Sequence, residues 1–106
     1  MDTHSFQVGQ IVFAKAGKDK GQPYVIAYIQ VQMLALIDGK RRTLTKPKHK
    51  KMIHVSKTNY LTDLSQPLAT VYSPQFDQTQ ANKLMLKDSD IRAAIKQCLS
   101  ASSQPL

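Results

Sequence analysis

Short apolar runs separated by glycine-containing turns constrain the fold of this chain most strongly. Residues 8–15 (VGQIVFAK) and 24–32 (YVIAYIQVQ) are rich in Val, Ile and aromatic residues, a composition typical of β-strands. Between them, Gly17 and Gly21 permit a positive φ and predict a tight loop, which Asp19 is expected to stabilise. A third strand is expected over residues 34–37, and it ends at the Asp38-Gly39 turn.

Two further strands are expected in the basic stretch that follows. They cover residues 41–45 (RRTLT) and 51–56 (KMIHVS), on either side of a break at Pro47. Because proline cannot donate a hydrogen bond to a strand ladder, residues 46–51 (KPKHKK) are expected to form a protruding loop. Five short strands with tight turns predict a mainly β fold, a small five-stranded barrel over residues 1–58 in which closure removes exposed edges.

The second half of the chain has a different pattern. Residues 59–87 contain two prolines and many Gln, Thr and Ser residues, which predicts an irregular linker partly packed on the barrel. Residues 88–100 fit a C-terminal amphipathic helix, because Ile91, Ile95 and Cys98 fall on one stripe together with Ala94 and Leu99. A helix of about three turns is not stable alone, so it is expected to dock either on its own barrel or on a partner.

Composition argues against a membrane-spanning, secreted or disulfide-linked protein. The longest uninterrupted apolar run, residues 33–37, is too short to cross a bilayer, so no membrane partner is expected. The N-terminal MDTHSFQ lacks the pattern of a signal peptide, and a cytoplasmic protein is the simplest expectation. The single cysteine, Cys98, excludes an internal disulfide and a zinc knuckle.

Enzymatic signatures are also missing from the sequence. Gly17 and Gly21 are too close together for a phosphate-binding P-loop, and Gln22 stands where that motif requires Lys. His49 and His54 have neither metal-ligand spacing nor a neighbouring cysteine, and Cys98 lies on the apolar stripe of a helix. A non-enzymatic protein without metal or cofactor is therefore expected.

The positive charge is confined to one half of the chain. The formal net charge is +8, and residues 1–57 hold eleven Lys/Arg against three Asp, whereas residues 58–106 hold four of each sign. Residues 39–51 (GKRRTLTKPKHKK) contain seven Lys/Arg and no acid. Such a run is either a solvated face or a surface that follows a phosphate backbone, and its clustering favours nucleic acid. Aromatic residues are few and no pair is spaced as a stacking platform, so recognition by shape and phosphate contacts is expected.

The first half of the chain resembles a known family. The stretch VGQIVFAKAGKDKGQPYVIAYI resembles a KOW motif, the strand–glycine loop–strand unit of SH3-like barrels in ribosomal proteins and transcription elongation factors. With VIAYIQVQMLALIDG and KRRTLTKPKHKKMIHV, the match over residues 8–58 is similar to large-subunit ribosomal proteins of the fourteen-e type and to small KOW proteins of Gram-positive bacteria. The chain departs from the fuller motif at Pro23-Tyr24, where a second glycine is often found.

The resemblance implies an SH3-like barrel that binds RNA. The motif residues carried over are Lys15, Gly17, Lys18, Lys20 and Gly21, and the RNA-binding face would extend over Lys40, Arg41, Arg42, Lys46, Lys48, His49, Lys50 and Lys51. The expected function is RNA binding in association with the ribosome or translation, with ribosomal RNA and ribosomal proteins as partners. The alternative is an SH3-like protein-interaction module of the transcription or translation machinery, which would bind through the neutral second half.

Overall fold

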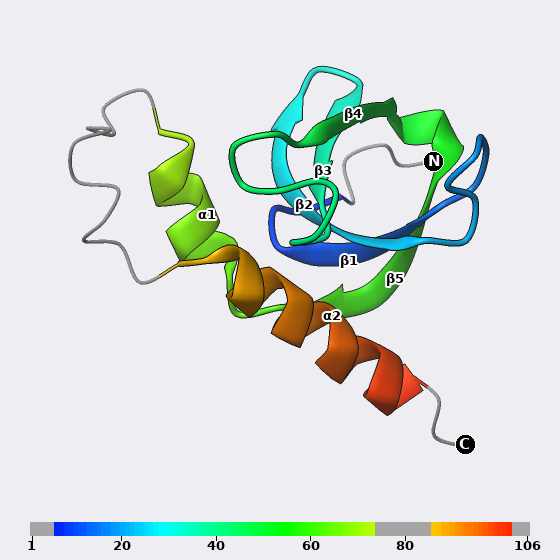
Figure 1. Ribbon diagram of the computed structural model, residues 1–106. Helices are drawn as coiled ribbons and strands as arrows, with labels where there is room; N and C mark the ends of the chain where they lie inside the picture. The colour runs from blue at the N-terminus through cyan, green and yellow to red at the C-terminus, as the bar shows by residue number, and fades with distance from the viewer. Residues whose placement is uncertain (1–5, 74–85, 103–106) are drawn as a thin grey trace.

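The computed structural model describes residues 6–73 and 86–102, and these form a mainly β structure with a C-terminal helix (Figure 1). Its antiparallel sheet has five strands in the order β4-β3-β2-β1-β5. The strands are β1 (Gln10–Ala14), β2 (Pro23–Gln30), β3 (Met33–Ile37), β4 (Lys48–Lys51) and β5 (Val55–Leu61). A 3-10 turn, η2 (Met52–His54), joins β4 to β5, and two helices follow, α1 (Ser65–Val71) and α2 (Asp88–Ser102).

The sheet is curved but open. Ile26 of β2 pairs with Leu36 and Tyr28 pairs with Ala35, so Ala27 is an extra residue that forms a bulge and bends the strand. Strands β4 and β5 are the two edges of the sheet, and no backbone pairing joins them within the described part of the chain. The predicted closed barrel is therefore not observed. Strand β4 is only four residues long, and η2 carries the chain from one edge to the other without a shared ladder.

Each face of the sheet carries its own cluster of buried residues. Successive residues of a strand point to opposite faces, so each strand contributes to both clusters. On one face, the strands pack against one another through Val12, Ala14, Tyr24, Ile26, Leu34, Leu36 and Val55. The other face packs against the helices through Ile11, Val25, Ala27, Ala35 and Ile37. Figure 1 shows both helices outside the curl of the sheet. This two-sided burial gives a small domain most of its apolar contacts.

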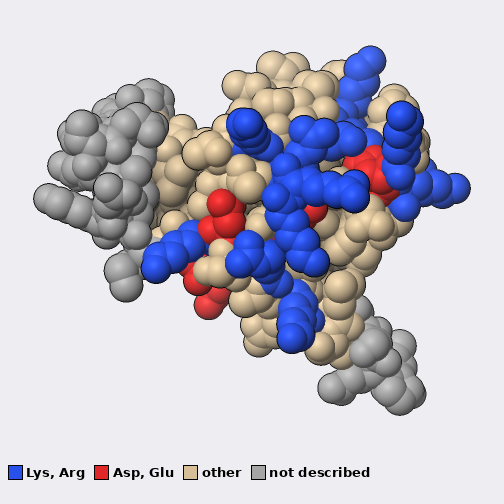
Figure 2. Space-filling model, viewed as in Figure 1, with Lys and Arg blue, Asp and Glu red and all other residues tan. Residues whose placement is uncertain are grey.

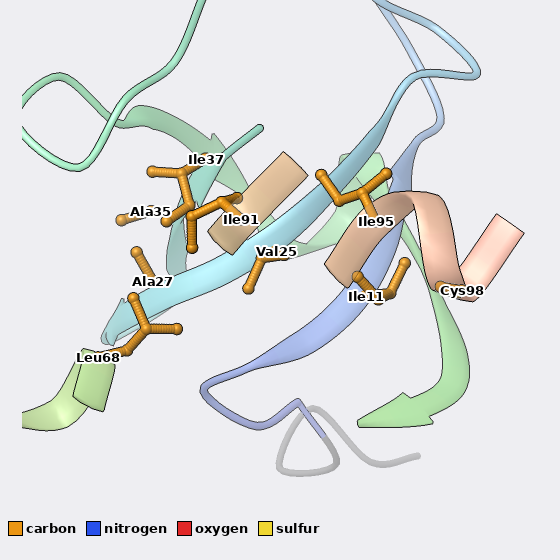
Figure 3. Packing of buried hydrophobic residues seen from close by; sticks show 9 residues of the cluster. All are labelled: Ile11, Val25, Ala27, Ala35, Ile37, Leu68, Ile91, Ile95 and Cys98. Atoms are coloured by element: carbon orange, nitrogen blue, oxygen red, sulfur yellow. The ribbon is translucent and has the colours of Figure 1, made fainter. Parts of the chain in front are cut away.

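Helix α2 confirms the predicted amphipathic helix and docks on its own sheet. Figure 3 shows Ile91, Ile95 and Cys98 projecting from the helix toward Val25 and Ile11. Ile91 is fully buried and Ile95 is 7% exposed, whereas Leu99 at the edge of the stripe is 39% exposed. The sequence left open whether this helix docks in cis or on a partner, and the structure places it in cis. No described helix has the length and apolar character that a bilayer crossing requires.

The basic stretch is organised differently from the prediction. The strand expected over residues 41–45 is wrong, because Asp38 holds this region in a turn by accepting hydrogen bonds from the backbone N–H groups of Lys40 and Arg42, each 2.9 Å long. The loop expected over residues 46–51 is also wrong, because Lys48–Lys51 form β4 and pair with β3. Pro47 precedes the first paired residue, so it does not interrupt the ladder. A lysine-rich strand is compatible with an edge position, where charge opposes pairing with other chains.

The irregular linker expected over residues 59–87 is wrong in its first part. Strand β5 continues to Leu61, and α1 begins at Ser65. Pro67 is the third residue of α1, in the first turn, where a backbone N–H has no partner within the helix. Leu68 is fully buried and anchors α1 on the sheet. The part of the predicted linker at 74–85 lies outside the described residues.

The turn between β2 and β3 holds a strained residue. Gln30 pairs with Met33, so Val31 and Gln32 form a two-residue turn in which Val31 has a φ of 51° and is 91% exposed. A β-branched residue in the left-handed region is strained, and glycine would adopt this φ without a steric cost.

We expect Val31→Gly to raise the free energy of unfolding by about 1 kcal/mol, because relief of the strain exceeds the added flexibility of the unfolded chain. The measurement is urea unfolding followed by circular dichroism. Gln32→Gly is the matched control, since Gln32 lies in the same turn without a positive φ, and it should lower the free energy of unfolding. Equal losses for the two variants would contradict the strain at Val31.

Candidate nucleic-acid interface

Two basic segments that are distant in sequence meet in one open cleft of about 530 Å³. One wall comes from the loop between β1 and β2 and from the start of β2, and the other comes from the Asp38–Arg42 turn and the start of β4. The residues that line the cleft are Lys18, Asp19, Gln22, Tyr24, Asp38, Lys40, Arg41, Arg42 and Lys48. Figure 2 shows Lys and Arg side chains gathered in the middle of one face of the molecule, with acidic atoms visible between them.

The cleft is positively charged. Its lining contains five Lys/Arg and two Asp, which gives a net charge of +3. Both carboxylates are engaged within the protein, because Asp38 accepts from backbone N–H groups of its own turn and Asp19 accepts from lysines. The guanidinium groups of Arg41 and Arg42 present planar forks of donors, which suit phosphate oxygens.

Helix α2 fixes the turn that carries these arginines. The Arg92 guanidinium donates a hydrogen bond of 2.6 Å to the Gly39 carbonyl oxygen, and Asp88 accepts one of 2.8 Å from the Leu44 backbone N–H. Gly39 has a φ of 78°, and a Cβ there would collide with the main-chain oxygen of Asp88. Glycine is therefore required at this contact both by its backbone conformation and by its packing.

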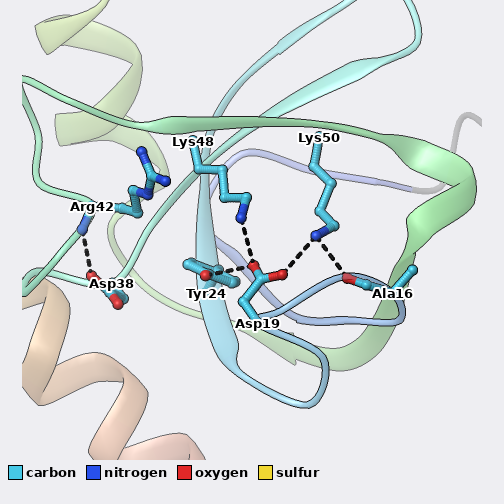
Figure 4. A network of polar contacts seen from close by, with 7 residues as sticks. All are labelled: Ala16, Asp19, Tyr24, Asp38, Arg42, Lys48 and Lys50. Carbon is cyan, nitrogen blue, oxygen red and sulfur yellow. Dashed lines mark hydrogen bonds and ion pairs between the residues drawn. The ribbon is translucent and has the colours of Figure 1, made fainter.

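The loop between β1 and β2, which contains Gly17 and Gly21, is the glycine loop. The Asp19 carboxylate in this loop pairs with lysines of β4 and so holds the loop against that strand (Figure 4). It accepts hydrogen bonds from Tyr24 Oη at 2.7 Å and Lys50 Nζ at 2.8 Å, and Lys48 Nζ lies 3.2 Å away. Lys50 Nζ also donates to the Ala16 carbonyl oxygen at 2.9 Å. The sequence predicted that Asp19 stabilises its own turn. In the structure it also connects that turn to β4.

Lys48 and Lys50 of β4 differ in how far their side chains are exposed to a ligand. The Lys50 side chain is 10% exposed and is held by two partners in the loop, whereas the Lys48 side chain is 27% exposed and lines the cleft. Lys48 can therefore reach a ligand phosphate while Lys50 keeps the loop attached. Alternation along β4 explains why these two share a side, since residues two apart on a strand point the same way.

The environment of Asp19 keeps it ionised. Burial acts to raise the pKa of the Asp19 carboxyl, but the hydrogen bonds from Lys50, Tyr24 and Lys48 outweigh that effect and hold the pKa well below its usual range. Burial raises the pKa of Tyr24, and its hydrogen bond to Asp19 raises it further, so this phenol stays a donor.

The remaining predicted residues do not line the cleft. Lys15, Gly17, Lys20 and Gly21 are exposed on or beside the glycine loop, where Gly17 and Gly21 have the positive φ angles that the sequence suggested, 89° and 87°. Lys46 precedes β4 and Lys51 is its last residue, and both are exposed. His49 points to the opposite side of β4 from Lys48 and contacts Tyr28.

Several residues of the site were missed by sequence reasoning. Gln22, Tyr24 and Asp38 line the cleft, and nothing in their spacing identified them. No group of three or more His, Cys, Asp or Glu residues that could hold a metal ion occurs among residues 6–73 and 86–102. Cys98 packs in the helix-facing core, where burial raises the pKa of its thiol.

The comparisons with known proteins do not assign a family. No model of a known protein family matches the chain, and no curated protein matches it. The resemblance to KOW proteins therefore depends on the motif residues alone.

We expect Asp19→Asn to lower the free energy of unfolding by about 2 kcal/mol at neutral pH, because Lys50 loses its charged acceptor. The pKa of Asp19 is lowered in the folded state, so its contribution is complete above the unfolded value of 3.8 and is lost as the pH falls toward the folded value. The stability difference between the wild type and Asp19→Asn should therefore shrink from pH 5 downward.

Urea unfolding across this pH range measures the difference. Asp63→Asn is the matched control, since Asp63 is exposed, and it should change the free energy of unfolding by less than about 0.5 kcal/mol. A stability difference for Asp19→Asn that stays constant from pH 7 to pH 2 would contradict the charged network.

Proposed function

We propose that this protein is a non-enzymatic RNA-binding module that docks on the sugar-phosphate backbone through the cleft between the glycine loop and the Asp38–Arg42 turn. The observation that carries the proposal is the convergence of Lys18, the turn residues 40–42 and Lys48 on one cleft. Phosphate contacts of this kind give affinity and orientation with little dependence on base sequence.

The proposal includes an SH3-like relationship and a role at the ribosome or in translation, in the cytoplasm. The five-stranded antiparallel sheet supports the relationship, although it is not closed into a barrel. So does the glycine loop between β1 and β2, which occupies the place that it has in the KOW motif. Ribosomal RNA is the RNA that the resemblance favours.

The protein-interaction alternative places the binding surface in the neutral second half of the chain. Within that half, Ile91 and Ile95 of the helix stripe are buried against the sheet of the same chain, so they do not offer an apolar surface to a partner. Among the exposed positions of α2, Lys96 and Gln97 are polar, and Leu99, 39% exposed, is apolar. The basic cleft is the better supported binding surface.

We expect RNA binding with a steep dependence on salt. If the five Lys/Arg of the cleft each neutralise a phosphate, log K should fall with log salt with a slope of about −4. Arg41→Glu combined with Arg42→Glu should weaken RNA binding at least about tenfold, because two phosphate contacts are lost and the new carboxylates repel the phosphates. Fluorescence anisotropy with a labelled structured RNA measures both quantities.

Lys87→Glu combined with Lys96→Glu is the matched control, because it reverses the same number of charges at exposed positions outside the cleft. Circular dichroism establishes that both variants fold. A slope near zero, or equal losses for the two double variants, would show that the cleft is not the binding site.

A further inference from the structure

A second group of side chains lies on the opposite side of β4 from the basic cleft. Tyr28 of β2 pairs with Ala35 of β3, and Ala35 pairs with His49 of β4, so the three residues form one row across the sheet. Directly paired residues share a face, and the small Ala35 side chain leaves room for the two rings to meet above it. The Tyr28 hydroxyl and His49 Nε2 are 2.7 Å apart, and the ring centroids are 5.7 Å apart at an angle of 63°.

Tyr72 supports this row from behind. Its ring lies 4.8 Å from that of Tyr28, and its hydroxyl donates a hydrogen bond of 2.6 Å to the Leu44 carbonyl oxygen. Burial raises the pKa of Tyr72 to about 12, so the hydroxyl remains a donor. The aromatic row, defined as the rings of Tyr28 and His49, is therefore held through Tyr72 to the end of α1.

The imidazole of His49 is the exposed member of the row. Its hydrogen bond to Tyr28 uses a nitrogen at the edge of the ring, so the contact fixes the ring without covering its face. Lys51, which is also exposed, lies two residues further along β4 and points to the same side. Strand β4 is an edge of the sheet, with Lys48 directed to one of its sides and His49 and Lys51 to the other.

We propose that the aromatic row is a base-stacking subsite, in which an unpaired RNA base stacks on the His49 imidazole while the backbone of the same strand follows the β4 edge. The inference rests on the proposed function and adds that the bound RNA contains unpaired nucleotides. Stacking on an exposed ring beside cationic side chains is how proteins hold single strands with little sequence preference.

The geometry favours binding over packing as the purpose of the row. A histidine held only for packing would lie within the core, whereas His49 is exposed on a strand whose neighbours on both sides are lysines. A base needs a flat, immobilised and uncovered ring next to positive charge, and His49 meets each requirement.

The test compares two fluorescein-labelled probes of about ten nucleotides, a length within the site sizes of single-strand binders. One probe is oligouridine, and the other is an abasic oligoribonucleotide with the same number of phosphates. Anisotropy titrations at one salt concentration should show that the wild type binds oligouridine at least about fivefold more tightly. His49→Ala should abolish this preference, and His49→Phe, which keeps a ring at the position but loses the contact with the Tyr28 hydroxyl, should retain part of it.

Each alternative outcome is informative. Equal affinity of the wild type for the two probes, with the steep salt dependence intact, would overturn the stacking subsite and leave the proposed function standing. Absence of binding to either probe, with binding to the structured RNA retained, would overturn the subsite alone, and absence of salt-dependent binding to the structured RNA as well would overturn the proposed function. Equal losses for both probes in His49→Ala would also overturn the subsite. Thermal unfolding of both His49 variants shows whether they are folded. Tyr28→Phe, which removes only the hydroxyl, should reduce the preference for oligouridine over the abasic probe, because the His49 ring is then held less firmly.

Discussion

The Asp19 carboxylate is the contact on which the candidate site depends. It lies in the glycine loop and is held by Tyr24 at the start of β2 and by Lys48 and Lys50 on β4, at the far edge of the sheet. Without this anion, two lysines of one short strand would face the same side with no compensating charge. The network thereby fixes the loop against β4 and gives the cleft its first wall, and α2 fixes the second wall through Arg92 and Gly39.

The edge position of β4 links the fold to the proposed function. The alternating direction of side chains along β4 places Lys48 in the basic cleft and His49 on the aromatic row. The same lysines protect the edge from pairing with another chain. The same short segment thus contributes to both stability and the proposed binding. Within it, Lys50 is held by two partners and is 10% exposed, whereas Lys48 pairs with Asp19 alone and is 27% exposed at the cleft.

The sequence was most informative where local chemistry decides the structure. The strands around the glycine loop and the amphipathic helix from Asp88 follow from composition and periodicity, and both are observed. The turn at Val31 was missed because it contains no glycine or asparagine, and β4 was missed because a run of lysines next to Pro47 has the composition of a loop. The Asp19 network and the row of Tyr28 and His49 depend on strand register, which only the tertiary structure supplies.

Lysine footprinting is the most direct test of the central claim that RNA binds in the cleft. Acylation of the folded protein, read by mass spectrometry with and without a structured RNA, reports each lysine separately. RNA bound in the cleft should protect Lys18, Lys40 and Lys48, whereas Lys50 should react slowly in both states and Lys87 and Lys96 should be unchanged. Protection of Lys87 and Lys96 with no change at the cleft lysines would contradict it.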